Sequence, residues 1–254
     1  NLMKKIILLF TICVYSCSEY SSEVNKTLEM SGDNKEELIK VLDHYKNQDN
    51  HKKLKAAEFL IENMLGKSYR NNSPFLNVFL IKLDSLRSLQ TEIKEKDLKI
   101  IWKKCESQNY NKFSERKFDV RTVTAKLLID NIDEAFSIWE KAPWSANFTF
   151  EQFCEYVLPY RNVHGTPTIW RKGIREKYQW ALDKNSKKDI LQTVNQINDS
   201  IHWFKYFYKM NTVPEMNISD LYRVKYGSCR HHSSLKIGVL RSLGIPAAQV
   251  FALT

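Results

Sequence analysis

The stretch that decides the fold is GSCRHHSSLKIGVLRSLGIPAAQVFA, which occupies residues 227–252. Its apolar residues, beginning at Leu235, recur at the three- and four-residue spacing of a helix with one buried face. Gly244 and Pro246 follow the last of them and are typical of a helix end. The stretch therefore predicts a buried helix with Cys229 in its first turn, followed by a strand.

Two histidines follow Cys229 closely, which raises the question of a metal site. Ligands at positions 229, 231 and 232 would have to converge from one helical turn, although residues two apart on a helix point in different directions. A zinc ion needs at least three protein ligands, and the sequence holds no second cluster of cysteines and histidines. We therefore expect no metal and no cofactor.

The place of Cys229 favours a nucleophile over a core thiol. The unpaired N–H groups and the dipole of a helix N-terminus favour the thiolate, which is the reactive form of cysteine. The same N–H groups can bind an oxyanion that develops on a substrate. Cys105 and Cys154 lie instead on apolar helical stripes, and we expect both in the core.

Residues 226–252 resemble the active-site segment of the transglutaminase-like superfamily of papain-like proteins. In that pattern a Gly-x-Cys, here Gly227 and Cys229, opens a buried helix that ends in Arg-x-Leu-Gly-Ile-Pro-Ala, here 241–247. The upstream segments LLIDNIDEAFSIWEKAPW and FEQFCEYVLPYR resemble the helical lead-in of lipoprotein members from Bacteroidetes. The resemblance covers roughly residues 120–254.

The resemblance implies an α+β papain-like or transglutaminase-like fold, predominantly α-helical in this chain, with a strand starting at its C-terminal end. It also implies acyl chemistry, in which the Cys229 thiolate attacks an amide carbonyl and forms a thioester. In the family a histidine and an aspartate on later strands assist the cysteine. Both are expected beyond Thr254, so the chain is interpreted as an N-terminal fragment.

Neither neighbouring histidine is expected to replace the missing base. His231, two residues after the cysteine, points away from it on a helix. His232 can approach the thiol, but no third residue on the same helix would orient it.

The N-terminal segment resembles the export signal of a bacterial lipoprotein. Two lysines at positions 4 and 5 precede an apolar run over residues 6–15, which is too short to span a bilayer. Cys17 then follows Val14 and Ser16 in the spacing of a lipobox. We expect a signal peptide over 1–16, lipid attachment at Cys17, a tether over 17–32, and anchoring to the outer membrane of the cell envelope. An ordinary cleaved signal is the alternative.

Between the two ends, helical periodicity predicts an antiparallel bundle over 33–111 and the N-terminal part of the transglutaminase-like domain over 112–254. Within the second, Thr149 and Gln152 predict a capping box. Arg161, Trp170 and Arg171 lie in or beside an irregular stretch and are candidates for substrate binding. The alternative is that the arginines pair with internal carboxylates and hold the loop.

The net charge of +10 comes from lysines spread along helix faces and not from a dense basic block, so we expect no nucleic-acid partner. The leading hypothesis is a lipid-anchored cysteine enzyme that hydrolyses a peptide or amide, or transfers its acyl group. The alternative is a non-catalytic surface lipoprotein that binds peptide or glycan through the same fold. The sequence leaves the substrate open.

Overall fold

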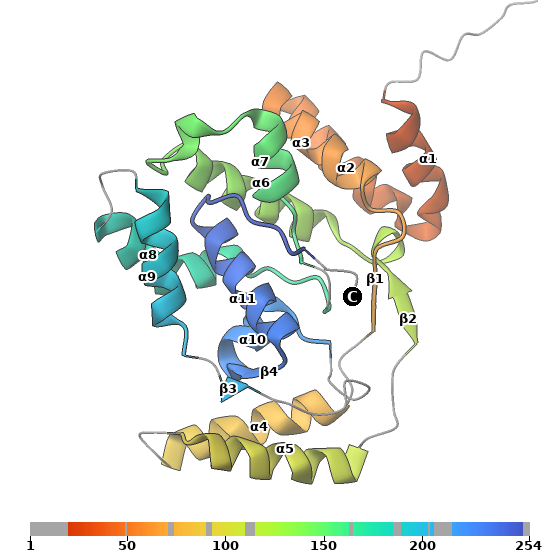
Figure 1. Cartoon of the computed structure of the whole chain (residues 1–254). Coiled ribbons are helices and arrows are strands. Elements are labelled where there is room, and N and C mark those ends of the chain that lie inside the picture. Colours follow the sequence, from red (N-terminus) through yellow and green to blue (C-terminus); the bar gives the residue numbers. More distant parts are fainter. Residues whose placement is uncertain are drawn as a thin grey trace, which may run out of the picture.

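The computed structural model describes residues 20–48, 50–70, 74–89, 93–109, 115–162, 165–184, 189–202, 204–205 and 215–250. These residues are mostly helical, with only short strands (Figure 1). The predicted signal segment and Cys17 lie outside the described residues. Of the helices that the structure describes, none combines the length and the hydrophobicity needed to cross a bilayer.

The helices are α1 (Ser22–Met30), α2 (Lys35–Asn47), α3 (His51–Glu62), α4 (Pro74–Leu89), α5 (Glu95–Asn109), α6 (Ala125–Trp139), α7 (Phe150–Tyr156), α8 (Arg171–Lys184), α9 (Ile190–Ser200), α10 (Ile218–Val224) and α11 (Cys229–Ser242). Strands β1 (Ser68–Arg70) and β2 (Arg116–Phe118) pair antiparallel, with Tyr69 opposite Lys117. Strands β3 (Phe204–Lys205) and β4 (Tyr226–Gly227) pair in parallel.

The apolar side chains form two cores. One lies among α1, α2, α3, α6 and α7, and the other among α4, α5, α8, α9, α10 and α11. Helix α6 serves both, because Phe136 belongs to the first core and Ile138 to the second. In Figure 1 helix α11 runs through the middle of the molecule, with α4 and α5 below it and α1 to α3 on the opposite side.

The predicted bundle over 33–111 is divided between these two cores. The apolar faces of α2 and α3 pack on α6, whereas α4 and α5 turn theirs toward the helices that follow. Trp102 of α5 shows the reason, since its ring meets Phe79 of α4 at 5.0 Å and Tyr226 of β4 at 5.3 Å between centroids. Helices α4 and α5 therefore cover the part of the second core that contains β4, the strand just before α11.

Both core cysteines are confirmed, whereas the strand expected after α11 is not found among residues 245–250. Cys105 and Cys154 are buried. After the helix, the Ala247 N–H donates to the Tyr156 carbonyl at 3.2 Å, and the Ala247 carbonyl accepts from Arg241 Nε at 2.9 Å. These bonds occupy main-chain groups that a sheet partner would need. Residues 251–254 lie outside the described part of the chain.

The packing of α11 on α10 predicts opposite effects for two glycine substitutions. A Cβ on Gly238 of α11 would lie 2.7 Å from Ile218 Cγ2, so Gly238→Ala should lower the free energy of unfolding by about 1–3 kcal/mol. Gly173 of α8 has no atom within 4 Å of that position, and Gly173→Ala should raise the free energy by about 0.5 kcal/mol. Urea titrations of both variants measure the difference; equal effects would contradict this packing.

Candidate functional site

Cys229 is the first residue of α11, and its side chain is exposed. The helix behind it is largely buried, packing against α8, α10 and β4. Tyr226, three residues earlier, is fully buried with its ring edge against Trp102. The chain therefore leaves the core at β4, exposes one thiol, and returns to the core within the next turn.

The turn before the thiol is fixed by His231. Ser228 and His231 form a reciprocal capping box, in which the Ser228 N–H donates to His231 Nδ1 at 3.3 Å. Gly227 has φ +151°, and a Cβ there would lie 2.8 Å from His231 Nδ1. Glycine is thus needed for the imidazole to approach the backbone. His231 is buried, and its imidazole caps the start of the helix.

The surroundings of the thiol suit attack on a carbonyl group. The first N–H groups of α11 have no acceptor within the helix, and Cys229 is the first residue of that helix. Among the described residues, no side chain or main-chain group forms a hydrogen bond with the Cys229 thiol. No three histidine, cysteine, aspartate or glutamate side chains in the described ranges lie close enough to hold a metal ion.

The two other described cysteines differ from Cys229 in exposure and acidity. Burial raises the pKa of the Cys105 thiol, and it raises the pKa of Cys154 to about 12, with nearby glutamates adding to the effect. Both thiols are therefore protonated and shielded at neutral pH. Of these three cysteines, only Cys229 has a surface position from which it can react.

The opposite end of α11 is held by main-chain bonds. Gly244, with φ +74°, follows the helix, and its N–H donates to the Arg241 carbonyl at 3.2 Å. The Ile245 N–H donates to the Leu240 carbonyl at 2.9 Å, which completes a Schellman motif. The glycine and the following Ile-Pro of the sequence motif therefore end the helix as predicted.

Two of the three residues predicted to bind substrate lie in the interior. Trp170 is buried, and its Nε1–H donates to the Tyr160 carbonyl at 2.6 Å. Arg171 is only 3% exposed, and its guanidinium donates to Asn131 and to main-chain carbonyls, among them that of Arg241 at 3.2 Å. Through these hydrogen bonds both side chains hold neighbouring segments together in the interior. Their role in substrate binding stays a prediction.

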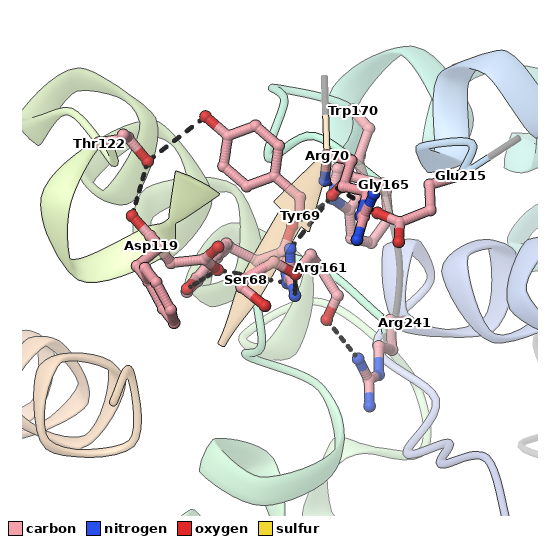
Figure 2. A network of polar contacts seen from close by, with 12 residues as sticks. Ser68, Tyr69, Arg70, Asp119, Thr122, Arg161, Gly165, Trp170, Glu215 and Arg241 are labelled. Atoms are coloured by element: carbon pink, nitrogen blue, oxygen red, sulfur yellow. Dashed lines mark hydrogen bonds and ion pairs between the residues drawn. The ribbon is translucent and has the colours of Figure 1, made fainter. Parts of the chain in front are cut away.

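Arg161, the third, holds the irregular stretch as the alternative reading expected. Its Nε lies 3.3 Å from Asp119 Oδ2, and its Nη2 donates to the Ser68 carbonyl at 2.8 Å (Figure 2). Asp119 is fully buried and also accepts from the Tyr160 hydroxyl at 2.6 Å. Burial raises the pKa of Asp119, while Arg161 and the Tyr160 hydroxyl oppose that shift.

Arg161 also lines a cavity of about 560 Å³, together with Lys67, Asn162 and Arg241. A second cavity of about 530 Å³ lies between α6 and α8. Cys229 lines neither of these two cavities, nor does Trp170 or Arg171. Sequence reasoning missed Lys67 because it belongs to no motif, and it treated Arg241 only as part of the helix-end pattern.

A family model for the transglutaminase-like superfamily matches residues 178–254. The matched range begins within α8 and contains α9, α10 and the whole of α11, with Cys229 at its start. No curated protein and no solved structure matches the chain with significance. The match agrees with the mostly helical α+β fold class predicted from the sequence, and it makes cysteine-type chemistry a candidate function.

The capping box predicts that His231 supports the helix start through one acceptor atom. His231→Ala should lower the free energy of unfolding by about 1–3 kcal/mol, because the buried Ser228 N–H loses its acceptor. His231→Gln should recover part of this loss, since glutamine is a usual partner in this motif. Thermal and urea unfolding compare the two variants. If alanine and glutamine are equally destabilising, the hydrogen bond is not what the imidazole contributes.

Proposed function

We propose that the protein uses Cys229 as the nucleophile in acyl chemistry on a peptide or amide substrate. The observation that carries this proposal is an exposed thiol on the first residue of an otherwise buried helix. The match of residues 178–254 to the transglutaminase-like superfamily supports it, because the matched range includes this helix start.

In the proposed reaction the thiolate sulfur forms a bond to the substrate carbonyl carbon. The tetrahedral oxyanion is stabilised by those N–H groups in the first turn of α11 that the capping box leaves free. The C–N bond then breaks, the amine leaves with a proton, and a thioester remains on Cys229. Water releases a carboxylic acid in hydrolysis, whereas a second amine forms a new amide in transfer. Neither the removal of the thiol proton nor the protonation of the amine is assigned to a described residue.

Alkylation of the thiols tests the proposed nucleophile. Iodoacetamide should modify Cys229 at least about tenfold faster than Cys105 or Cys154, because these two are buried and their pKa values are raised. Peptide mass spectrometry of the folded protein over time gives the three rates. Slow labelling of all three cysteines at one common rate would count against the proposal.

Substitution of the thiol then separates catalysis from packing. Cys229→Ala should abolish amide hydrolysis or transfer and change the free energy of unfolding by only about 0.5 kcal/mol, since the side chain is exposed. Cys154→Ala, which empties a buried site, is the matched comparison for stability. A large loss of stability in Cys229→Ala would assign that residue to packing instead.

A non-catalytic binding protein is the second candidate. The observation that favours it is that the cavity lined by Arg161 and Arg241 does not include Cys229. Under this candidate, Cys229→Ala leaves binding of peptide or glycan unchanged, and no acyl-enzyme forms. Trapping a thioester with a slowly hydrolysed ester substrate distinguishes the two functions.

We further propose that Cys17 is acylated and anchors the protein to the cell envelope. The support is the apolar run over residues 6–15 and the lipobox-like spacing that follows it. Each buried CH₂ of a lipid chain contributes about 0.8 kcal/mol to anchoring. Expressed in a bacterium, the protein should incorporate labelled palmitate and partition with membranes, and Cys17→Ser should abolish both. Unlabelled, soluble wild-type protein would contradict the anchor.

A further inference from the structure

The cavity of about 560 Å³ lies among β1, the end of α7, the irregular stretch after it and the C-terminal end of α11. Its charged lining is predominantly basic, with Lys67, Arg116, Arg161 and Arg241 against Glu155 and Glu215. Figure 2 shows Arg161 between Ser68 and Arg241, with the Glu215 side chain near Gly165. The two cations that matter most, Lys67 and Arg241, form no ion pair with a carboxylate of the described residues.

Arg241 carries such a charge, and only 6% of its surface is exposed. Its Nε donates to the carbonyls of Tyr156 and Ala247, and its Nη1 donates to that of Arg161 at 3.3 Å. No described carboxylate lies within ion-pair distance of this guanidinium, and its Nη2 has no acceptor among the described residues. Arg161 differs, because buried Asp119 offsets its charge.

Lys67 and Asn162 add two further donors to the same cavity. The Lys67 side chain is half-buried and has no ion pair among the described residues. Burial lowers the pKa of Lys67; Asp119 and Glu155 oppose this shift, and the charges of Arg161 and Arg241 add to it. The Nδ2 atom of Asn162 is sealed from solvent and has no hydrogen-bond partner within the described part of the chain. A buried donor without an acceptor is costly.

The carboxylates of the cavity do not meet this need. Glu215 Oε2 accepts from the Arg70 N–H at 3.0 Å. Glu155 is exposed, and its charge acts on Lys67 and Arg241 without an ion pair or hydrogen bond to either. Buried cations and unpartnered donors are stabilised when an anion supplies both negative charge and acceptor atoms. Arg241, Lys67 and Asn162 together therefore provide the positive charge and the hydrogen-bond donors that an oxyanion requires.

We propose that this cavity binds the oxyanion group of a small ligand, a phosphate or a carboxylate, through Arg241, Lys67 and Asn162. The ligand oxygens replace the missing acceptors for Arg241 Nη2 and Asn162 Nδ2, and Lys67 supplies a second positive charge. Bidentate geometry at a guanidinium fits both phosphate and carboxylate.

This site is separate from the thiol. Arg241 lies twelve positions after Cys229 along α11, and at about 1.5 Å per residue this places their backbones roughly 18 Å apart. The inference rests on the cavity alone and stands whether or not Cys229 is catalytic.

Calorimetric titration of the full chain with sodium phosphate, and separately with sodium acetate, tests the proposal at constant ionic strength. Wild-type protein should bind at least one of these anions saturably, and which one binds identifies the oxyanion class. Lys67→Met should weaken binding about tenfold or more, because it removes a charged donor. Asn162→Leu should weaken binding about threefold to tenfold, as expected for a neutral donor.

Lys117→Met is the matched control. Lys117 belongs to the neighbouring strand β2, is exposed and does not line the cavity, so its removal should leave affinity within about twofold. Circular dichroism melting of each variant identifies any that fails to fold, and the Asn162 variant then carries the test. Absence of saturable binding of both anions, or equal affinities for the Lys67 and Lys117 variants, would overturn the proposal.

Discussion

The buried guanidinium of Arg171 connects α8 with α6, with α11 and with the segment after α7 through hydrogen bonds. From the first turn of α8, its Nε donates to Asn131 of α6 at 2.6 Å, its Nη1 reaches the carbonyl of Arg241 in α11, and its Nη2 serves the carbonyls after α7. Hydrogen bonds to charged groups contribute about 1.5–3 kcal/mol each. From its own helix α8, this one side chain therefore bonds to α6, to α11 and to the segment that follows α7.

Helix α11 then carries two different chemical environments at its ends. At its start, the capping box of Ser228 and His231 brings the chain out of the core and leaves the thiol of Cys229 exposed. At its other end, the side chain of Arg241 is buried and bonded to three carbonyls. The same helix therefore presents a nucleophile candidate to solvent and contributes a cation to the cavity at its other end.

Local sequence patterns were sufficient to predict the elements that depend on local physics. The start and end of α11, the capping box of α7 at Thr149 and the burial of Cys105 and Cys154 all follow from periodicity and capping residues, and the structure confirms them. The division of α2 to α5 between two cores could not be predicted, because an apolar stripe does not specify its partner. Likewise, the interactions of Lys67 and Asp119 arise between segments far apart in the chain.

The defined caps of α11 have a consequence for how sequences of this kind can diverge. Because both ends are fixed by main-chain bonds, deleting one residue between them would turn one end by about 100° and shift it by about 1.5 Å relative to the other. Cys229 would then rotate toward the interior, or Arg241 would lose its carbonyls. Homologous chains that keep both features should therefore differ in this helix by exchange of side chains and place their insertions and deletions in the connecting loops.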